Sequence, residues 1–162
     1  IQNMPAGIGE PVFEKLSANL GKAILSIGAV KAFEIGDGTA VAHALGHTNN
    51  DQYTRDPDGK IIKLTNHSGG ILGGISDGSD IVVRAAFKPT PSIASKQRTV
   101  NRSGAPIELE IRGRHDPVIV PRAVVVVEAM TALTVADALL AGMSAKLENV
   151  KKVWGSADSR KP

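Results

Sequence analysis

Cysteine is absent from this chain of 162 residues, which excludes disulfide bonds and any mechanism that needs a thiolate. Aromatic residues make up only 3% of the sequence, and the net charge of +3 arises from lysines and arginines spread along the chain. Proteins that bind nucleic acids use aromatic platforms or a concentrated basic patch, so we expect no nucleic-acid partner. The absence of cysteine also fits a reducing compartment, and we expect a cytoplasmic protein.

Common nucleotide and metal motifs are missing as well. The chain contains no Gly-Lys-Ser or Gly-Lys-Thr, and the glycines at 69–74 lack the Gly-x-Gly-x-x-Gly spacing of a dinucleotide site. His43 and His47 have the spacing of two metal ligands on one helix face, but Gly46 lies between them and no third ligand is evident. Two solvated surface histidines are the alternative, and we expect no metal site.

No signal peptide is recognisable, and the chain begins with Ile1 in place of Met, so we expect a fragment or a processed product. The most apolar stretch, at 123–141, is about as long as a membrane span but carries Glu128 and Asp137. An acidic side chain near the centre of a bilayer costs about 2.5–3.5 kcal/mol. We therefore interpret this stretch as a buried helix of a soluble protein and expect no membrane partner.

The composition is that of an ordinary globular protein, with 42% hydrophobic and 22% charged residues, and the length suits one domain. Hydrophobic periodicity predicts helices at 10–27, 39–45 and 121–147. It predicts strands at 30–35, 60–65, 81–87, 97–101 and 107–111, and the last two form a hairpin. We expect an α+β domain at 1–150, with an antiparallel sheet packed on long helices, and a flexible tail at 151–162.

Two of these segments are predicted to be buried. The strand at 81–87 is nearly all apolar, which is typical of a strand covered on both faces. The helix at 121–147 carries few polar residues in its first part, so it should be enclosed on most sides, like a helix layer between sheets. By contrast, we expect the polar run at 47–60 to form a loop that contains a turn.

Glycine is concentrated in one loop, at 66–78, which contains the pairs 69–70 and 73–74. Glycine permits positive φ and lets backbone amides approach a ligand, which suits anions. The strand at 81–87 leads from this loop to the segment Lys88-Pro-Thr-Pro-Ser92, which supplies an ammonium group and two hydroxyl groups. The two loops together could hold a phosphorylated molecule. Tight turns and close packing are the alternative explanation of such glycine pairs.

A second group of charged residues occupies 112–122, with three arginines, one histidine and one carboxylate. Arg114, His115 and Asp116 have the chemistry to bind an anion and to exchange protons. Alternatively, the segment forms an Asp-Pro turn with surface ion pairs, ahead of a helix that begins with Pro121. The residue types alone leave both interpretations open.

Several short blocks of sequence, in a fixed order along the chain, resemble the C-terminal part of chorismate synthase. The blocks are Gly-Ile-Gly-Glu-Pro-Val-Phe at 7–13, Ala-Val-Lys-Ala-Phe-Glu-Ile-Gly-Asp-Gly at 29–38, Ser-Gly-Gly-Ile-Leu-Gly-Gly-Ile at 68–75, Phe-Lys-Pro-Thr-Pro-Ser-Ile at 87–93, Gly-Arg-His-Asp-Pro at 113–117, Pro-Arg-Ala at 121–123 and Val-Glu-Ala-Met at 127–130. Agreement across so many separate blocks is far more specific than any one glycine pattern.

The resemblance implies an activity, a cofactor and an assembly. Chorismate synthase converts 5-enolpyruvylshikimate 3-phosphate to chorismate and phosphate by 1,4-anti elimination, and it requires reduced FMN although the reaction has no net redox change. Some family members use NADPH to reduce the flavin. Full-length members form homotetramers, and each subunit has a β-α-β sandwich fold of which this chain would form half.

The resemblance also implies site residues by position. Those expected to bind the flavin are Gly28, Ala29, Gly73, Lys88, Pro89, Thr90, Pro91, Ser92 and Arg114. Asp116 matches a carboxylate that the family places close to flavin N5 for proton transfer, so it is the catalytic residue expected in this chain.

Family members are roughly twice as long as this chain, and their N-terminal half supplies two catalytic histidines and the arginines that hold the substrate phosphates. His115 does not correspond to either catalytic histidine, and the pair His43 and His47 has no family role. We therefore expect this chain to carry much of the flavin site and to be inactive alone. The alternative is a non-catalytic folded fragment, or an assembly domain, that binds no flavin by itself.

Overall fold

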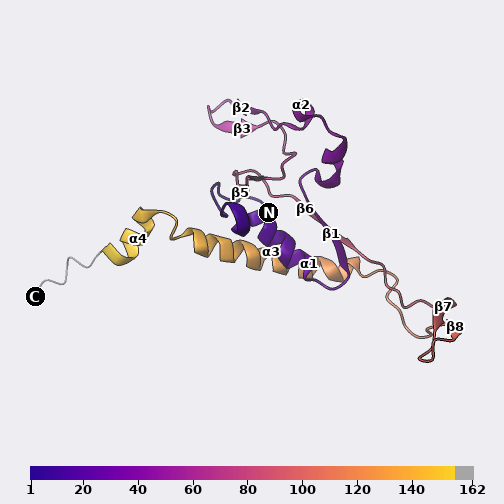
Figure 1. The fold of residues 1–162 in the computed structure, drawn as a ribbon. Coiled ribbons are helices and arrows are strands. Elements are labelled where there is room, and N and C mark those ends of the chain that lie inside the picture. The colour runs from indigo at the N-terminus through magenta and orange to yellow at the C-terminus, as the bar shows by residue number, and fades with distance from the viewer. Residues whose placement is uncertain (156–162) are drawn as a thin grey trace, which may run out of the picture.

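The structure is a computed structural model that describes residues 1–155. Its helical elements are η1 (Val12–Glu14), α1 (Leu16–Leu25), η2 (Gly38–His43), α2 (Gly46–Asn49), α3 (Val120–Gly142) and α4 (Leu147–Trp154). Its strands are β1 (Val30–Ile35), β2 (Tyr53–Arg55), β3 (Ile61–Lys63), β4 (Ile71–Leu72), β5 (Ile75–Ser76), β6 (Val83–Phe87), β7 (Gln97–Val100) and β8 (Pro106–Leu109). The β7–β8 hairpin and α4 extend from opposite ends of a central body (Figure 1).

The core forms around α1, because its apolar residues recur on one face of the helix. Leu16, Leu20 and Ile24 are four residues apart in turn, and all three are fully buried. This helix packs against β1 and α3. Met4, Ile71 and Ile81 complete the core cluster around it. The helix predicted at 10–27 is therefore confirmed, although its first turn is the separate η1.

The longest pairing in the structure joins β1 to β6. The two strands are antiparallel, with Val30 opposite Phe87 and Ile35 opposite Val83. The three other sheets are hairpins between neighbouring strands, namely β2–β3, β4–β5 and β7–β8. The α+β class is confirmed, and the antiparallel sheet that we expected is divided among small two-stranded sheets.

The β2–β3 hairpin corrects the prediction of a loop at 47–60. Residues 53–55 form β2, which pairs with β3, so the strand predicted at 60–65 is the second arm of a hairpin. The turn that closes it is the expected one, because the Gly59 amide donates to the Asp56 carbonyl at 2.9 Å. Sequence reasoning missed β2 because its three exposed residues lie within a polar run and show no alternation of apolar and polar side chains.

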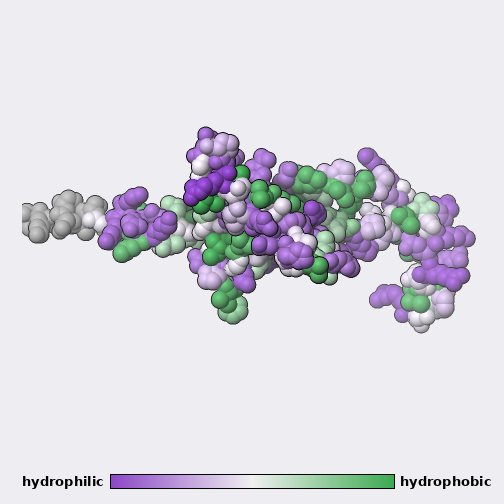
Figure 2. Space-filling view, turned by 90° about the horizontal axis from the view of Figure 1, so that it is seen from above, coloured by the Kyte–Doolittle hydropathy of each residue, from purple (hydrophilic) through white to green (hydrophobic). Residues whose placement is uncertain are grey.

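Strand β6 and helix α3 are less buried than predicted. The side chains of β6 alternate between half-buried and exposed, because a ribbon of two strands cannot cover both faces of either strand. Ala123 is the only buried residue of α3, and many of its apolar side chains are exposed. The surface of the central body carries hydrophobic patches (Figure 2). By length and composition α3 is apolar enough to cross a membrane, a test that core helices of soluble proteins also pass.

The C-terminal region contains a break that the sequence pattern did not indicate. Helix α3 ends at Gly142, short of the predicted end near 147, and glycine is a poor helix former. A turn follows, and α4 then begins at Leu147. The expected boundary between domain and tail, at 150, falls within α4, and residues 156–162 of the expected tail lie outside the described residues.

Candidate functional site

The turn after α1 and the start of the segment 88–92 lie side by side. The Lys88 amide donates to the Ala29 carbonyl at 2.8 Å, which extends the pairing of Val30 with Phe87 by one step. We call residues 28–29 and 88–92 the strand-end cluster, since they occupy one end of the β1–β6 ribbon. Gly28, Ala29 and Lys88, which were predicted to share a site, are thus brought together.

The backbone of the strand-end cluster is held in an uncommon conformation. The Val30 amide donates to the Ile27 carbonyl at 3.2 Å, which closes a tight turn with Gly28 and Ala29 at its centre. Ala29 has a φ of 69°, a region that disfavours residues with a Cβ atom. Both Gly28 and Ala29 are exposed, so their backbone atoms are open to a ligand.

The segment 88–92 contains a buried hydroxyl group without a partner. Thr90 Oγ1 is shielded from solvent and makes no hydrogen bond to any described residue. Buried polar atoms nearly always have a hydrogen-bond partner, so an unpaired hydroxyl indicates a position where a ligand could supply one. The segment is anchored next to it by Gln97, whose Nε2 donates to the Pro91 carbonyl at 3.1 Å. Ser92 is half-buried and Pro89 is exposed.

Arg114 and Asp116 lie in the irregular segment before α3. Asp116 Oδ2 is 3.4 Å from a guanidinium nitrogen of Arg122, and both side chains are exposed. Arg114 is exposed, and no ion pair involves it within residues 1–155. Phe87 and Val120 line one cavity of about 190 Å³, so the start of α3 lies beside the end of β6. This places the segment at the same end of the ribbon as the strand-end cluster.

Gly73 is at the other end of α1. It occupies the tip of the β4–β5 turn with a φ of 60°, and a Cβ atom there would meet nothing within 4 Å. Next to it, the Gly74 carbonyl accepts a hydrogen bond of 2.8 Å from the Leu16 amide, the first residue of α1. Gly28 follows the last turn of this ten-residue helix, which at 1.5 Å per residue is about 15 Å long. The structure therefore does not bring Gly73 next to the strand-end cluster.

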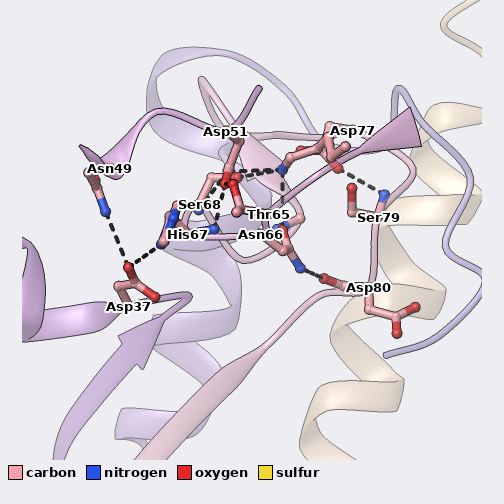
Figure 3. Close-up of polar contacts among 12 residues, drawn as sticks. Asp37, Asn49, Asp51, Thr65, Asn66, His67, Ser68, Asp77, Ser79 and Asp80 are labelled. Atoms are coloured by element: carbon pink, nitrogen blue, oxygen red, sulfur yellow. Dashed lines mark hydrogen bonds and ion pairs between the residues drawn. The ribbon is translucent and has the colours of Figure 1, made fainter. Parts of the chain in front are cut away.

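A buried polar network, which sequence reasoning missed, surrounds Lys63 (Figure 3). Lys63 Nζ lies 2.8 Å from Asp77 Oδ2 and 3.1 Å from Asp51 Oδ2. It also donates to Ser68 Oγ at 2.9 Å and to Asn66 Oδ1 at 3.2 Å. The side chains of Lys63, Asp51 and Asp77 are only 5%, 6% and 9% exposed. We call these five residues the Lys63 network.

Asp51 is the most heavily bonded carboxylate of this network. Besides Lys63, it accepts hydrogen bonds from the Thr65 hydroxyl and from the amides of His67 and Ser68, at 2.7–3.0 Å. Burial alone would raise the pKa of Asp51, but the bonds from Ser68, Thr65 and His67 outweigh it and hold that pKa well below its usual range. Asp51 is therefore an anion at neutral pH.

The two other charges of the network are also held in their ionised forms. Burial would lower the pKa of Lys63, yet its contacts with Asp77 and Asp51 raise that pKa. Burial would raise the pKa of Asp77, but the hydrogen bond from Lys63 and those from Ser79 lower it. The network is thus one ammonium between two carboxylates, and the excess negative charge is matched by additional N–H and O–H donors.

A second pair links the same loop to the end of β1. His67 Nδ1 lies 2.6 Å from Asp37 Oδ2, which also accepts a hydrogen bond of 3.2 Å from the Asn49 side chain. The Asp37 amide donates to the His67 carbonyl at 2.9 Å.

A signal for Lys63 was present in the sequence, because it is the single charge within the apolar run at 61–64. Its partners gave no signal, since they belong to other loops.

The two histidines considered as metal ligands are both exposed, His43 at the end of η2 and His47 in α2. Within the part of the chain that the structure describes, no three or more histidine, cysteine, aspartate or glutamate side chains are grouped to hold a metal ion.

A family model described as chorismate synthase matches residues 1–140. The chain belongs to the chorismate synthase family. The chorismate synthase of Lachnoclostridium phytofermentans is 68% identical over 154 residues, which are 95% of this chain and 42% of that protein. The chorismate synthase of Agathobacter rectalis is 63% identical over 150 residues, which are 93% of this chain and 41% of that protein.

Structural similarity agrees with the family assignment. A solved structure described as "Crystal Structure of Chorismate Synthase" superimposes with a TM-score of 0.69 at 32% identity, and the match covers 95% of this chain and 39% of that one. The resemblance to chorismate synthase that the sequence blocks indicated is therefore confirmed. The chain spans about two fifths of the length of the curated relatives it matches.

Proposed function

We propose that this chain is the FMN-site portion of a chorismate synthase, a lyase that converts 5-enolpyruvylshikimate 3-phosphate to chorismate and phosphate by 1,4-anti elimination. Membership of the family supports the reaction class. The observation that carries the assignment of this site is the orphaned hydroxyl of Thr90, in the segment predicted to surround the flavin. A bound ligand that offers a polar atom to Thr90 Oγ1 removes the cost of leaving it unpaired.

The charges around Thr90 fit a ligand with a phosphate group. Lys88 and Arg114 are exposed and form no ion pair within residues 1–155, so both are free to bind an anion. Gly28 and Ala29 add an open stretch of backbone beside Lys88. The chemistry of these residues therefore fits FMN, which in its reduced form supplies electron density to the substrate as phosphate leaves.

The residues of this chain have separate tasks in this proposal. Gly28, Ala29 and the segment 88–92 bind and orient the flavin, and Arg114 offers it a guanidinium group. Asp116 would accept a proton at flavin N5, and its contact with Arg122 at 3.4 Å orients the carboxylate. We also propose that the full-length enzyme is a cytoplasmic homotetramer and that NADPH reduces the flavin where the organism uses that route.

We expect the chain to be inactive alone. It spans about two fifths of the relatives' length, and the family resemblance implies that the catalytic histidines and the arginines for the substrate phosphates belong to the remaining part. A second candidate is a folded portion that binds no flavin by itself. One observation favours it: α1 separates Gly73 from the strand-end cluster, so the predicted flavin contacts do not form one pocket in this chain.

A titration of FMN into this chain, followed by flavin fluorescence, tests the proposal. Lys88→Ala should weaken binding at least tenfold, which is about 1.4 kcal/mol. Lys60→Ala is the matched control, since Lys60 is an exposed lysine of the β2–β3 turn, outside the strand-end cluster. Equal losses in both variants, or no binding by the parent chain, would reject a flavin site in this chain and favour the second candidate. Phosphate release from substrate by this chain with reduced FMN would reject its inactivity.

A further inference from the structure

We propose that Lys63 is a positioning residue for the glycine loop 66–78, because its buried ammonium holds the entry and the exit of this loop in one fixed relation. The loop presents Gly73 at its tip, and the identity of the ligand that Gly73 meets rests on the function proposed above. Lys63 itself belongs to β3, a different hairpin, and does not touch the tip. It acts through the loop.

The contacts of Lys63 Nζ are distributed on both sides of the loop. Asn66 and Ser68, at 3.2 Å and 2.9 Å, precede β4, whereas Asp77, at 2.8 Å, follows β5 (Figure 3). A movement of the ammonium therefore displaces both stems of the β4–β5 turn together. The base of the turn has a bond of its own, from the Asp77 amide to the Gly70 carbonyl at 3.0 Å.

The opposite side of the loop is attached to the body. The Leu16 amide donates to the Gly74 carbonyl at 2.8 Å, and the Ile8 amide donates to Ser76 Oγ at 2.9 Å. Gly73 lies between these two sets of contacts, with an exposed backbone and open space where a Cβ atom would be. The tip is therefore exposed but its two supports are buried, as expected for a backbone that must be presented to a ligand in one orientation.

The energetic character of the network also indicates a positioning role. Three charged side chains with exposures of 5–9% pay a large desolvation cost, and apolar residues of similar volume usually stabilise a fold as well or better. The best attested advantage of such buried ion pairs is that they select one arrangement of the chain. Here they select the position of the loop, since every partner of Lys63 except Asp51 lies in it.

The test compares the parent chain with Lys63→Met and with Lys63→Met/Asp77→Asn. The double variant avoids a buried Asp77 carboxylate that has lost its cation, so it is the one expected to fold if the single variant does not. Lys60→Met, on the same hairpin, is the control for the loss of one lysine, and its change of charge equals that of the single variant. Two readouts are used: hydrogen exchange of the amides of Gly70 and Asp77, and titration with FMN.

We expect amide exchange at Gly70 and Asp77 to rise at least tenfold in the double variant. In Lys60→Met it should change less than twofold. Exchange of the α1 amides should stay within twofold of the parent in both variants. General destabilisation would instead raise exchange in α1 as well, and that result, or unchanged exchange at Gly70 and Asp77, would overturn the positioning role. FMN affinity should fall at least fivefold in the double variant where Gly73 contacts the flavin, as the family resemblance implies. An unchanged FMN affinity with raised exchange would keep the positioning role of Lys63 and limit the flavin contacts to the strand-end cluster. If the parent binds no FMN, the proposed function fails for this chain, whereas hydrogen exchange still decides the role of Lys63.

Discussion

The ammonium of Lys63 lies 2.8 Å from the carboxylate of Asp77, and both side chains are at least nine-tenths buried. This pair joins β3 to the end of the glycine loop across 14 residues of chain. The pair supports the loop whose tip, Gly73, lies at one end of α1, whereas the strand-end cluster with Lys88 lies at the other end. The two ends can be tested separately.

Thr90→Val should stabilise the free chain and weaken its binding of FMN. Valine has nearly the same shape as threonine but lacks the buried hydroxyl that has no partner, so the unfolding free energy should rise by about 1 kcal/mol. The affinity for FMN should fall at least fivefold, because the ligand loses its contact with this hydroxyl. Urea unfolding and fluorescence titration measure the two effects, and Thr90→Ser, which keeps a hydroxyl, is the control. A valine variant that binds FMN as tightly as the parent would refute the assigned contact.

The stability of the chain should fall in acid because of Asp51. Its folded pKa lies below the value of about 3.9 in an unfolded chain, so the unfolded state binds more protons as the pH drops through this range. The contribution of Asp51 is complete above about pH 4 and is lost progressively below it. Urea unfolding between neutral and acid pH should give a shallower acid limb for Asp51→Asn than for the parent. Asp58→Asn removes an exposed carboxylate of the β2–β3 turn as the control, and parallel curves for Asp51→Asn and the parent would contradict the prediction.

Gly36→Ala should destabilise the chain more than Gly59→Ala. Both glycines have positive φ, 57° and 80°, so alanine costs about 1–2 kcal/mol at either position. At Gly36 the new Cβ would also collide with the His67 carbonyl and lie 2.6 Å from the Gly69 amide. This overlap adds about 1–3 kcal/mol to the loss of stability. At Gly59 nothing lies within 4 Å of the new Cβ. Thermal or urea unfolding of the two variants measures the difference. Equal losses would mean that β1 and the glycine loop are not in contact.

Leu20→Ala should cost about 2–5 kcal/mol of unfolding free energy, because Leu20 is fully buried in the core around α1. The same substitution at Leu140, which is 67% exposed on α3, should change it by no more than about 0.5 kcal/mol. Urea unfolding at several protein concentrations provides the measurement. A large, concentration-dependent loss for Leu140→Ala would show that α3 is covered by a second molecule in solution.

Local elements were predictable where their cause is local. Leu16, Leu20 and Ile24 repeat at the spacing of a helix face, and this pattern identified α1. The hairpin β7–β8 was likewise evident, because two strand-like runs flank a short polar turn. Strand β2 was missed, since its polar residues become a strand only through pairing with β3.

The sequence by itself determined the family, through blocks of residues whose order and identity need no fold to be recognised, and it determined most helices, strands and turns. Only the tertiary structure decided that Gly28 and Ala29 lie beside Lys88, that Gly73 lies an α1 length away, and that Lys63 is buried between Asp51 and Asp77. The physical reason is that these contacts join residues far apart in the chain. Hairpins and the β1–β6 pairing bring them together, and no local propensity specifies such pairings.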